Sequence, residues 1–198
     1  MWGCELPARV ELLRARFGVD SHIYIQPDPY RLPFEAATFD VVYANQVFEH
    51  VQRLEELIAE SRRILRPSGV LIACLPLRST PVELHMFVPF VHWVPAAWRE
   101  RYLGIWYSVM RPRHRLQYGS PDVMARADAR YISTETWYRS RRAVERLLAA
   151  DFRDVRLDTN RYVASKYAWL SHVPGVAQLV TYAVNACFIA TRPRRFST

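Results

Sequence analysis

The amino-acid sequence predicts an α/β fold in which mostly parallel strands are connected by helices. Short runs rich in β-branched and aromatic residues alternate with segments whose apolar residues recur every three or four positions. The strand-like runs are continuously apolar, as is typical of parallel strands covered on both faces. Strand, helix and strand also follow one another at the spacing of a crossover connection. The 198 residues, of which 51% are hydrophobic, suit a single globular domain.

The first part of the chain is predicted to alternate between helix and strand. LPARVELLRARFG (6–18) has a helical stripe of apolar residues that stops at a glycine, and HIYIQPD (22–28) is a short strand ended by prolines. FDVVYAN (39–45) is a second strand, RLEELIAESRRILRPSG (53–69) an amphipathic helix, and VLIACLP (70–76) a third, buried strand. The residues of this helix expected to face inward are Leu54, Leu57, Ile58, Ile64 and Leu65.

The second part begins with a change of pattern. From Arg78 to about Arg130 prolines and aromatic residues dominate and no period lasts, so we expect short helices and loops inserted over the sheet. A helix is predicted over 133–152, with Ser133 or Thr134 as its N-cap. DVRLDT and ACFIATR are two further strands. The segment 167–191 lacks charged residues but is interrupted by Pro174, so we interpret it as a buried helix leading into a strand, with contact to a bilayer surface as the alternative.

The charge and the cysteines limit the class of protein. The chain has 27 Lys and Arg residues against 19 Asp and Glu, a net charge of +8, which favours anionic partners or simply gives a solvated basic surface. Cys4, Cys74 and Cys187 form no CxxC pair, which argues against a disulfide framework or a zinc site of that kind. The N-terminus lacks the order of a signal peptide. We expect a cytoplasmic protein, with peripheral contact to the inner face of the membrane as a further expectation.

Polar residues follow the second predicted strand at the point where a ligand would bind. Ligands of open parallel sheets bind at the carboxyl ends of strands, where polar side chains emerge from an apolar core. Asn45, Gln46, Glu49 and His50 occupy that place after FDVVYAN. The sequence therefore predicts a ligand site at this end of the sheet.

These residues also resemble a known family, the class I S-adenosylmethionine-dependent methyltransferases, in their type 11, ubiquinone-biosynthesis-like branch. LPFEAATFDVVYANQVFEHV and RILRPSGVLIACLP are similar to its Leu-Pro-Phe, Phe-Asp-Val-Val, Glu-His and Arg-x-Leu-x-Pro-Gly-Gly motifs, with Ser68 in place of a Gly. LLAADFRDVRL is similar to its Leu-x-x-Ala-Gly-Phe-x-x-Val, with Asp151 in place of the Gly. The resemblance covers about 1–76 and 134–192. It implies one incomplete domain over 1–198, with a Rossmann-like methyltransferase sheet and 78–130 as a lid insertion on the substrate side.

The resemblance implies S-adenosyl-L-methionine as the cofactor and residues that bind it. Gly3-Cys4-Glu5-Leu6-Pro7 is similar to the family's Gly-x-Asp-x-Ser-Pro, which makes Glu5 the acid that hydrogen-bonds the ribose hydroxyls. Asp28, followed by Pro29, stands six residues before Phe34, as the family's adenine-contacting Asp does. Asn45 and Gln46 would line the junction between cofactor and substrate.

The family's glycine-rich loop has no counterpart in this sequence. The loop should precede Glu5 and uses Gly-x-Gly so that the backbone can approach the methionine end of the cofactor. The chain has six glycines, and no two of them form such a pair. By this pattern the first strand, the first helix and most of the second strand of the family are missing, and we expect an N-terminally truncated chain that starts at an internal Met. Its FDVVYAN strand would then carry an unpaired, apolar edge.

Three histidines are candidates for acid–base catalysis. His50 would sit where substrate and cofactor meet, and an ordinary histidine titrates near neutral pH. Alternatively, Glu49 and His50 cap the following helix. His85 and His92 lie in the aromatic insertion, where either could be a base on the substrate side or both could belong to an aromatic lid. No third ligand stands at a suitable spacing from His85 and His92, which argues against a metal site.

The expected function is methyl transfer to a small-molecule, sugar or lipid-linked acceptor. Similar histidine- and tryptophan-rich insertions occur in family members associated with bacterial glycan biosynthesis. Arginine clusters at 111–115 and 139–142 could meet a phosphate of such an acceptor or be solvated. The alternative is a non-catalytic remnant or partner-binding module, which the absent glycine loop favours. Nucleic-acid binding is not expected, because no binding motif is present and the aromatics are not interleaved with Lys and Arg.

Overall fold

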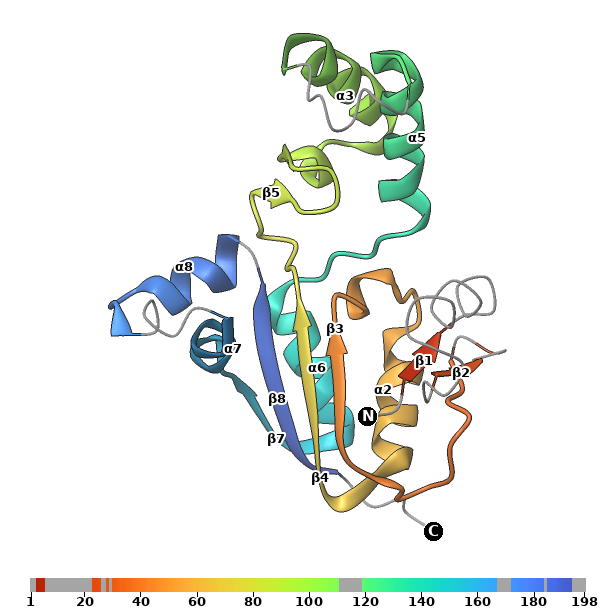
Figure 1. Ribbon diagram of the computed structural model, residues 1–198, viewed down its shortest axis with the longest axis vertical. Helices are drawn as coiled ribbons and strands as arrows, with labels where there is room; N and C mark the ends of the chain where they lie inside the picture. The colour runs from red at the N-terminus through yellow and green to blue at the C-terminus, as the bar shows by residue number, and fades with distance from the viewer. Residues whose placement is uncertain are drawn as a thin grey trace.

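The computed structural model describes residues 3–5, 23–25, 28, 30–110, 119–166, 172–183 and 185–193. Their elements form a body built on a sheet and a helical lobe that stands above it (Figure 1). The sheet has the strand order β3-β4-β8-β7. Its strands are β3 (Phe39–Asn45), β4 (Leu65–Leu75), β8 (Ala186–Pro193) and β7 (Phe152–Leu157). A separate parallel pair, β1 (Gly3–Glu5) and β2 (Ile23–Ile25), is drawn to the right of α2 (Leu54–Ile64) in the view of Figure 1.

The four-stranded sheet is mixed. β3 and β4 are parallel, with Asn45 opposite Cys74, whereas β8 is antiparallel to both β4 and β7. The predicted mostly parallel sheet is therefore wrong for the strands that the structure describes. After β7 the chain stays at one end of the sheet through α7 (Thr159–Lys166) and α8 (Val176–Ala183), so β8 must run back between β4 and β7 (Figure 1). An apolar run carries no information on strand direction, which is why the sequence did not reveal this reversal.

The predicted strands are otherwise confirmed, and the amphipathic helix predicted over 53–69 is confirmed over Leu54–Ile64, whereas residues 65–69 belong to β4. β3 has the bounds of FDVVYAN, and β2, β7 and β8 fall within or overlap the other predicted strands. The helix α2 carries acidic residues in its first turn and basic residues in its last, which complements the helix dipole. All five residues predicted to face inward are buried. The helix predicted over 6–18 lies outside the described residues.

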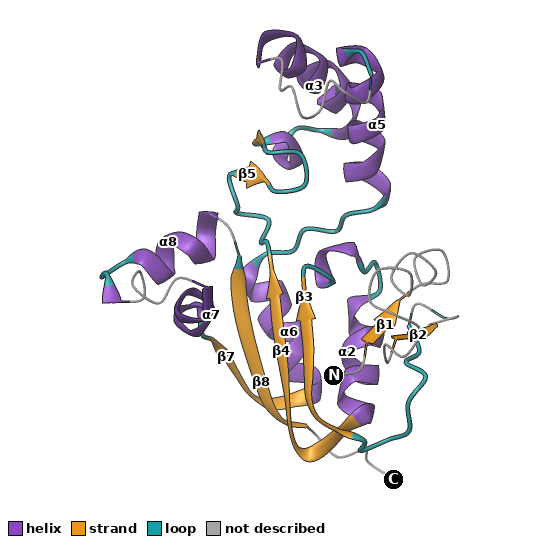
Figure 2. Cartoon of the chain, in the orientation of Figure 1, coloured by secondary structure: helices purple, strands orange, loops and turns teal. Residues whose placement is uncertain are grey.

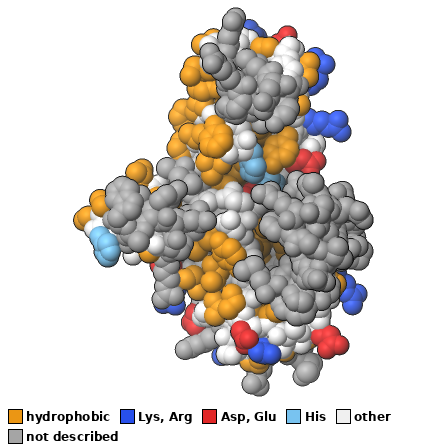
Figure 3. Space-filling model, viewed as in Figure 1, with side chains coloured by type: hydrophobic (Ala, Val, Ile, Leu, Met, Phe, Trp, Pro, Cys, Tyr) orange, Lys and Arg blue, Asp and Glu red, His pale blue; other side chains and the backbone are white. Residues whose placement is uncertain are grey.

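The main core lies between the sheet and the helices α2 and α6 (Arg141–Asp151), which cover one face (Figure 2). Leu54, Ile58, Leu71 and Phe188 are each 0% exposed in this core. Burial of a side chain of this size contributes about 1.5–3 kcal/mol. On the other face Val41 and Tyr43 of β3 are more than half exposed, and Figure 3 shows hydrophobic side chains gathered over the sheet. Among the described strands β3 pairs with β4 alone.

The upper lobe has its own core. It consists of β5 (Val82–Glu83), β6 (Val88–Pro89), η2 (Val91–Trp93), α3 (Ala96–Met110) and α5 (Pro121–Thr134). α3 and α5 pack together around the buried side chains of Leu103, Tyr107 and Met124. The prediction of only short helices here is wrong, since these helices have 15 and 14 residues. α3 exposes Ile105 and Val109 as well as burying Leu103, so its apolar residues surround the helix and no period stands out.

Two other predictions in the second half need correction. α5 ends at Thr134, and the next helix, α6, begins only after Ser140, whose hydroxyl accepts a hydrogen bond from the Ala143 N–H. Ser133 and Thr134 instead donate to carbonyls one turn earlier in α5. The segment 167–191 does contain a helix that leads into a strand, but Leu179 of α8 is 66% exposed, so the helix is not buried throughout. No helix in the described ranges is long and apolar enough to cross a bilayer.

Cys74 and Cys187 are neighbours in space despite their separation in sequence. They face each other across β4 and β8 as buried thiols, and Sγ of Cys74 donates to Sγ of Cys187 at 3.1 Å. Spacing along the chain could not show this, because the pairing depends on where β8 enters the sheet.

Candidate functional site

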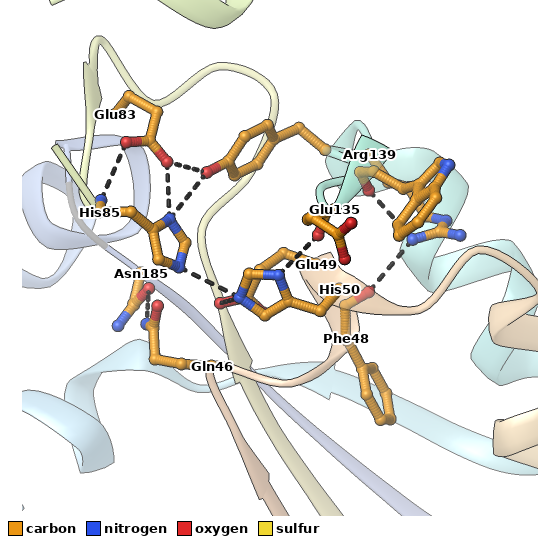
Figure 4. A network of polar contacts seen from close by, with 11 residues as sticks. Gln46, Phe48, Glu49, His50, Glu83, His85, Glu135, Arg139 and Asn185 are labelled. Carbon is orange, nitrogen blue, oxygen red and sulfur yellow. Dashed lines mark hydrogen bonds and ion pairs between the residues drawn. The ribbon is translucent and has the colours of Figure 1, made fainter. Parts of the chain in front are cut away.

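The carboxyl end of β3 leads into a group of polar side chains between the sheet and the lobe (Figure 4). Gln46 has φ = 56°, a left-handed conformation that a non-glycine residue adopts at a cost of about 1–3 kcal/mol. Its N–H donates to the Cys74 carbonyl at 2.9 Å, and its Nε2 donates to Oδ1 of Asn185 at 2.6 Å. These bonds turn the chain off the sheet into the short helix η1 (Phe48–His50). η1 carries Glu49 and His50.

Arg139 fixes η1 in place. Its guanidinium donates to the carbonyls of Phe48, Trp137, Val51 and Gln52 at 2.7–3.2 Å. The segment that returns from the lobe to the body is thereby fastened to η1, and the Trp137 N–H adds a bond to the Glu49 carbonyl at 2.6 Å. Burial lowers the pKa of Arg139 from its ordinary value, but an arginine stays charged at any physiological pH. Arg139 therefore has a structural role, in place of the phosphate contact or the solvated position considered for its cluster, because its donors are directed at the protein backbone.

His50 from the body and His85 from the lobe meet at the centre of the site. Their Nε2 atoms are 3.1 Å apart, and the rings lie edge to face (Figure 4). Nδ1 of His50 donates to the Glu135 carbonyl at 2.7 Å. Both side chains are partly open, with 31% and 26% of their surface exposed. Figure 3 shows histidine side chains at the surface between the lobe and the sheet.

Glu83 holds His85. Its Oε1 accepts from Nδ1 of His85 at 2.6 Å and from the Tyr138 hydroxyl, and its Oε2 accepts from the backbone N–H groups of His85 and Met86 at 2.9 Å. Burial opposes ionisation of Glu83, but these hydrogen bonds outweigh it and the pKa lies below its ordinary value. The hydrogen bond to Glu83 raises the pKa of His85. Burial raises the pKa of Tyr138, which therefore stays a hydrogen-bond donor.

Glu49 is the least satisfied group of the site. Its side chain is 0% exposed, and both carboxylate oxygens lack a hydrogen-bond partner among the described residues. Burial raises its pKa to about 7. Oε1 of Glu49 lies 4.0 Å from Nε2 of His50. The ligand atoms of Glu49, His50 and His85 all lie within 4.8 Å of one another. Spacing along the chain indicated no third metal ligand for His85 and His92. The fold, however, brings two potential ligands from η1, Glu49 and His50, close to His85.

His92 does not join this pair. Its ring packs against the ring of Tyr138, with centroids 5.0 Å apart, and against Trp93. Burial lowers its pKa. His92 thus belongs to the aromatic side chains around the site and contacts Tyr138 instead of the histidine pair.

The residues expected to bind the cofactor lie on different elements of the structure. Asn45 is exposed at the end of β3, and Gln46 follows it. Asp28 is exposed, accepts a bond from the Tyr30 N–H at 2.8 Å, and lines a pocket against α2, to which Asn45 does not contribute. The structure places Glu5 in β1, and Pro29 lies outside the described residues. In the described chain Asn45 and Gln46 thus stand at the end of β3 from which η1 and His50 follow, whereas the pocket lined by Asp28 does not include Asn45.

Sequence reasoning missed the residues that support the histidines. Glu83, Tyr138 and the Glu135 carbonyl come from the segments that enter and leave the lobe. The Glu-x-His spacing of Glu83 and His85 was the one signal in the sequence that could have suggested the first of them. The other contacts depend on how the lobe is placed over the sheet.

Comparison with known sequences identifies the N-terminal portion. Residues 3–73 match the family described as "Methyltransferase domain". A malonyl-[acyl-carrier protein] O-methyltransferase of Methylovorus sp. (strain MP688) is 33% identical over 61 residues, which is 31% of this chain and 21% of that protein. The corresponding protein of Enterobacter lignolyticus (strain SCF1) is 34% identical over 73 residues, 35% of this chain and 29% of that protein. The matched segment therefore spans less than a third of these curated relatives.

Comparison with solved structures concerns the fold of the whole chain. One similar chain comes from a Haloferax volcanii complex between the Trm112 methyltransferase activator and a methyltransferase. Its TM-score is 0.52 at 16% identity, and the match covers 98% of this chain and 72% of that chain. A SAM-dependent methyltransferase from Thermotoga maritima has a TM-score of 0.50 at 14% identity, covering 97% and 73%. At such low identity these likenesses show the fold alone.

Proposed function

Because the chain carries a domain of the class I S-adenosylmethionine-dependent methyltransferase family, type 11 branch, we propose that it transfers a methyl group from S-adenosylmethionine. The proposed acceptor is a small molecule, which is either free or attached to a sugar, a lipid or a carrier. The observation that supports this most strongly is the meeting of His50 and His85 at the carboxyl end of β3, next to Asn45. A polar, partly open centre at this end of the sheet is where a ligand of an open α/β sheet binds.

The residues in the described part of the chain fit a nucleoside cofactor in their chemistry. Asp28 and Asn45 are exposed and offer a carboxylate and a carboxamide, which suit amino and hydroxyl groups of a nucleoside. We assign Asp28, with Pro29, to the adenine, and Glu5 to the ribose. Gln46 has one amide N–H committed to Asn185, so its part is to shape the junction beside Asn45. The bound cofactor would supply the electrophilic methyl group.

His50 is suited to take the proton of an acceptor. Because the Glu135 carbonyl can only accept, Nδ1 of His50 carries a hydrogen and Nε2 of the neutral ring presents its lone pair. His85 lies beside that lone pair and is backed by Glu83, which stabilises positive charge on the pair. His50 and His85 therefore carry the acid–base role better than His92, which packs behind Tyr138.

The acceptor side is assigned to the insertion over 78–130. Its β5–η2 segment supplies His85, whose ring meets that of His50 beyond the end of β3 (Figure 4). The curated relatives are methyltransferases of malonyl groups on acyl-carrier protein, so an acyl group on a carrier is one acceptor to test beside free small molecules and sugar or lipid-linked ones. A lid of this kind would exclude water from the reacting groups.

Isothermal titration calorimetry with S-adenosylhomocysteine tests the proposal. We expect saturable binding at one site per chain. Asn45→Ala and Asp28→Ala should each weaken binding by roughly tenfold, since each loses about one hydrogen bond to the ligand. Asp122→Asn, an exposed carboxylate on α5, is the matched control and should bind as the unchanged chain does. No heat of binding would instead favour a non-catalytic, partner-binding protein, and equal binding by all variants would contradict the assignment of Asp28 and Asn45 to the cofactor.

A further inference from the structure

We propose that Glu49, His50 and His85 form a binding site for one divalent transition-metal ion, for which Zn²⁺ is the best fit. The three ligand atoms lie within 4.8 Å of one another and come from both parts of the molecule, two from η1 and one from the lobe. The inference concerns the same centre as the proposed methyl transfer but does not rest on it, because every ligand atom belongs to the protein. A cation and a proton would compete for the same lone pairs.

The other hydrogen bonds of the two rings leave their Nε2 atoms facing each other. Nδ1 of His50 must donate, since its partner is a backbone carbonyl. Nδ1 of His85 faces Oε1 of Glu83, a carboxylate that also receives bonds from two backbone N–H groups and a tyrosine hydroxyl, so it too must donate. In neutral rings both Nε2 atoms then lack a hydrogen, and they face each other at 3.1 Å. Such an arrangement is repulsive unless something positive lies between the two nitrogens.

The spacing of the two nitrogens is that of a shared metal ligand pair. Two histidine nitrogens bound at about 2.0–2.1 Å to a tetrahedral Zn²⁺ are separated by roughly 3.3–3.4 Å. The observed 3.1 Å is within a few tenths of an ångström of that value. For a cation to bind both nitrogens, they must separate by roughly 0.2–0.3 Å and the two lone pairs must turn toward one point.

Glu49 supplies the third ligand. It is fully buried, and neither of its oxygens has a hydrogen-bond partner in the described part of the chain. An unpaired buried carboxylate is costly, and a cation at the histidine pair removes that cost. Oε1 lies 4.0 Å from Nε2 of His50, so the carboxylate must approach by roughly 1 Å to complete the metal geometry.

The surroundings match those of known metal sites. Metal-binding histidines usually donate their second ring N–H to a carboxylate or a backbone carbonyl, which fixes the ring and its tautomer. Here Glu83 does so for His85, and the Glu135 carbonyl for His50 (Figure 4). With three protein ligands and partly exposed imidazoles, a fourth position stays open to water or to an oxygen of an acceptor, as in catalytic zinc sites.

Metal titration of the untagged protein, stripped with a chelator, tests the site. We expect calorimetry with Zn²⁺ to show one ion per chain, and Co²⁺ to give the visible absorption of a tetrahedral or five-coordinate centre. His85→Ala and Glu49→Gln should weaken Zn²⁺ binding at least tenfold, and Glu83→Gln by about 10–100-fold through loss of ring orientation. His172→Ala, an exposed histidine in the body, is the matched control and should bind as the unchanged chain does.

A second measurement guards against variants that fail to fold. Imidazole ¹⁵N spectra of the unaltered protein should show that Zn²⁺ moves the Nε2 signals of His50 and His85 and leaves the protonated Nδ1 signals in place. Absence of stoichiometric Zn²⁺ binding, or unmoved Nε2 signals, would overturn the inference and indicate a proton shared between the rings. The titration with S-adenosylhomocysteine described above is independent of these results, so failure of the metal site and failure of the methyltransferase proposal are distinguishable.

Discussion

Arg139 holds the candidate site together through backbone carbonyls. Its side chain binds four of them, on η1, on the residues after it, and on the segment that leaves the lobe. A guanidinium can do this because its donors form a rigid planar fork, which the single ammonium of a lysine cannot reproduce. The sequence showed Arg139 only as part of a basic cluster. Three of its four partners lie more than eighty residues earlier in the chain, so no local pattern could identify them.

Replacement of Arg139 by Ala should lower the free energy of unfolding by about 2 kcal/mol or more, because several partly buried carbonyls lose a charged donor. Arg139→Lys should recover only part of this loss. Arg142→Ala is the control: Arg142 is exposed on α6, and its removal should change stability by no more than about 0.5 kcal/mol. Urea unfolding followed by circular dichroism measures both. Equal midpoints for the two alanine variants would contradict the structural role given to Arg139.

At the scale of elements, the predictions succeeded where periodicity and burial agree. The strand β3 and the helix α2 were predicted closely because each has an uninterrupted apolar pattern that one core requires. The helix α6 was predicted to begin at Ser133 or Thr134, whereas Ser140 caps it. All three residues are suitable N-caps. Ser133 and Thr134 still belong to α5 of the lobe, so α6 can begin only after the chain has returned to the body, at Ser140.

The irregular first part of β4 depends on Gly69. β3 and β4 shift register between Phe39 and Val41, so the residues before Val70 bulge out of the pairing. A Cβ at Gly69 would lie 2.8 Å from Cδ2 of Leu65 and 2.9 Å from the backbone oxygen of Arg66. The second of these neighbours is main chain and has little freedom to move aside. This close approach explains why glycine stands here even though Ser68 replaces the glycine expected before it.

Gly69→Ala should therefore destabilise the protein by about 1–3 kcal/mol through overpacking. Gly104→Ala is the comparison variant for Gly69→Ala. Gly104 lies inside α3, and the atoms nearest to a new Cβ there would be 3.9 Å away. That change should stabilise the protein by about 0.5–1 kcal/mol, because alanine favours helix over glycine. Thermal unfolding of both variants tests the pair. A loss of stability in Gly104→Ala, or none in Gly69→Ala, would show that the local packing is described incorrectly.

At the scale of the whole molecule, the site lies at the junction of two separately packed parts. The body has one core beneath its sheet and the lobe has another between α3 and α5 (Figure 1). The two connections between them are bonded to each other by the Arg78 N–H and the Arg139 carbonyl, 2.8 Å apart. His50 belongs to one part and His85 to the other, so their contact depends on the placement of the lobe.

The sequence could therefore predict half of the site. Asn45, Gln46 and His50 follow a strand that the pattern identified, and their place at its end follows from the rule for α/β sheets. The partnership of His85 with His50, and the support from Glu83 and Tyr138, required the orientation of an insertion that shows no period. These contacts depend on how the lobe is placed over the sheet, which the sequence pattern does not indicate.

Chemical-shift mapping with S-adenosylhomocysteine tests the central claim most directly, namely that the cofactor binds at the end of β3 against the histidine pair. A ¹H–¹⁵N spectrum of the 23.2 kDa chain is recorded with and without the ligand. We predict the largest shifts at the amides of Asn45, Gln46 and His50 and at the imidazole of His85. Shifts confined to the opposite edge strand, β7, around Asp154 and Arg156, or no shifts at saturating ligand, would contradict the account.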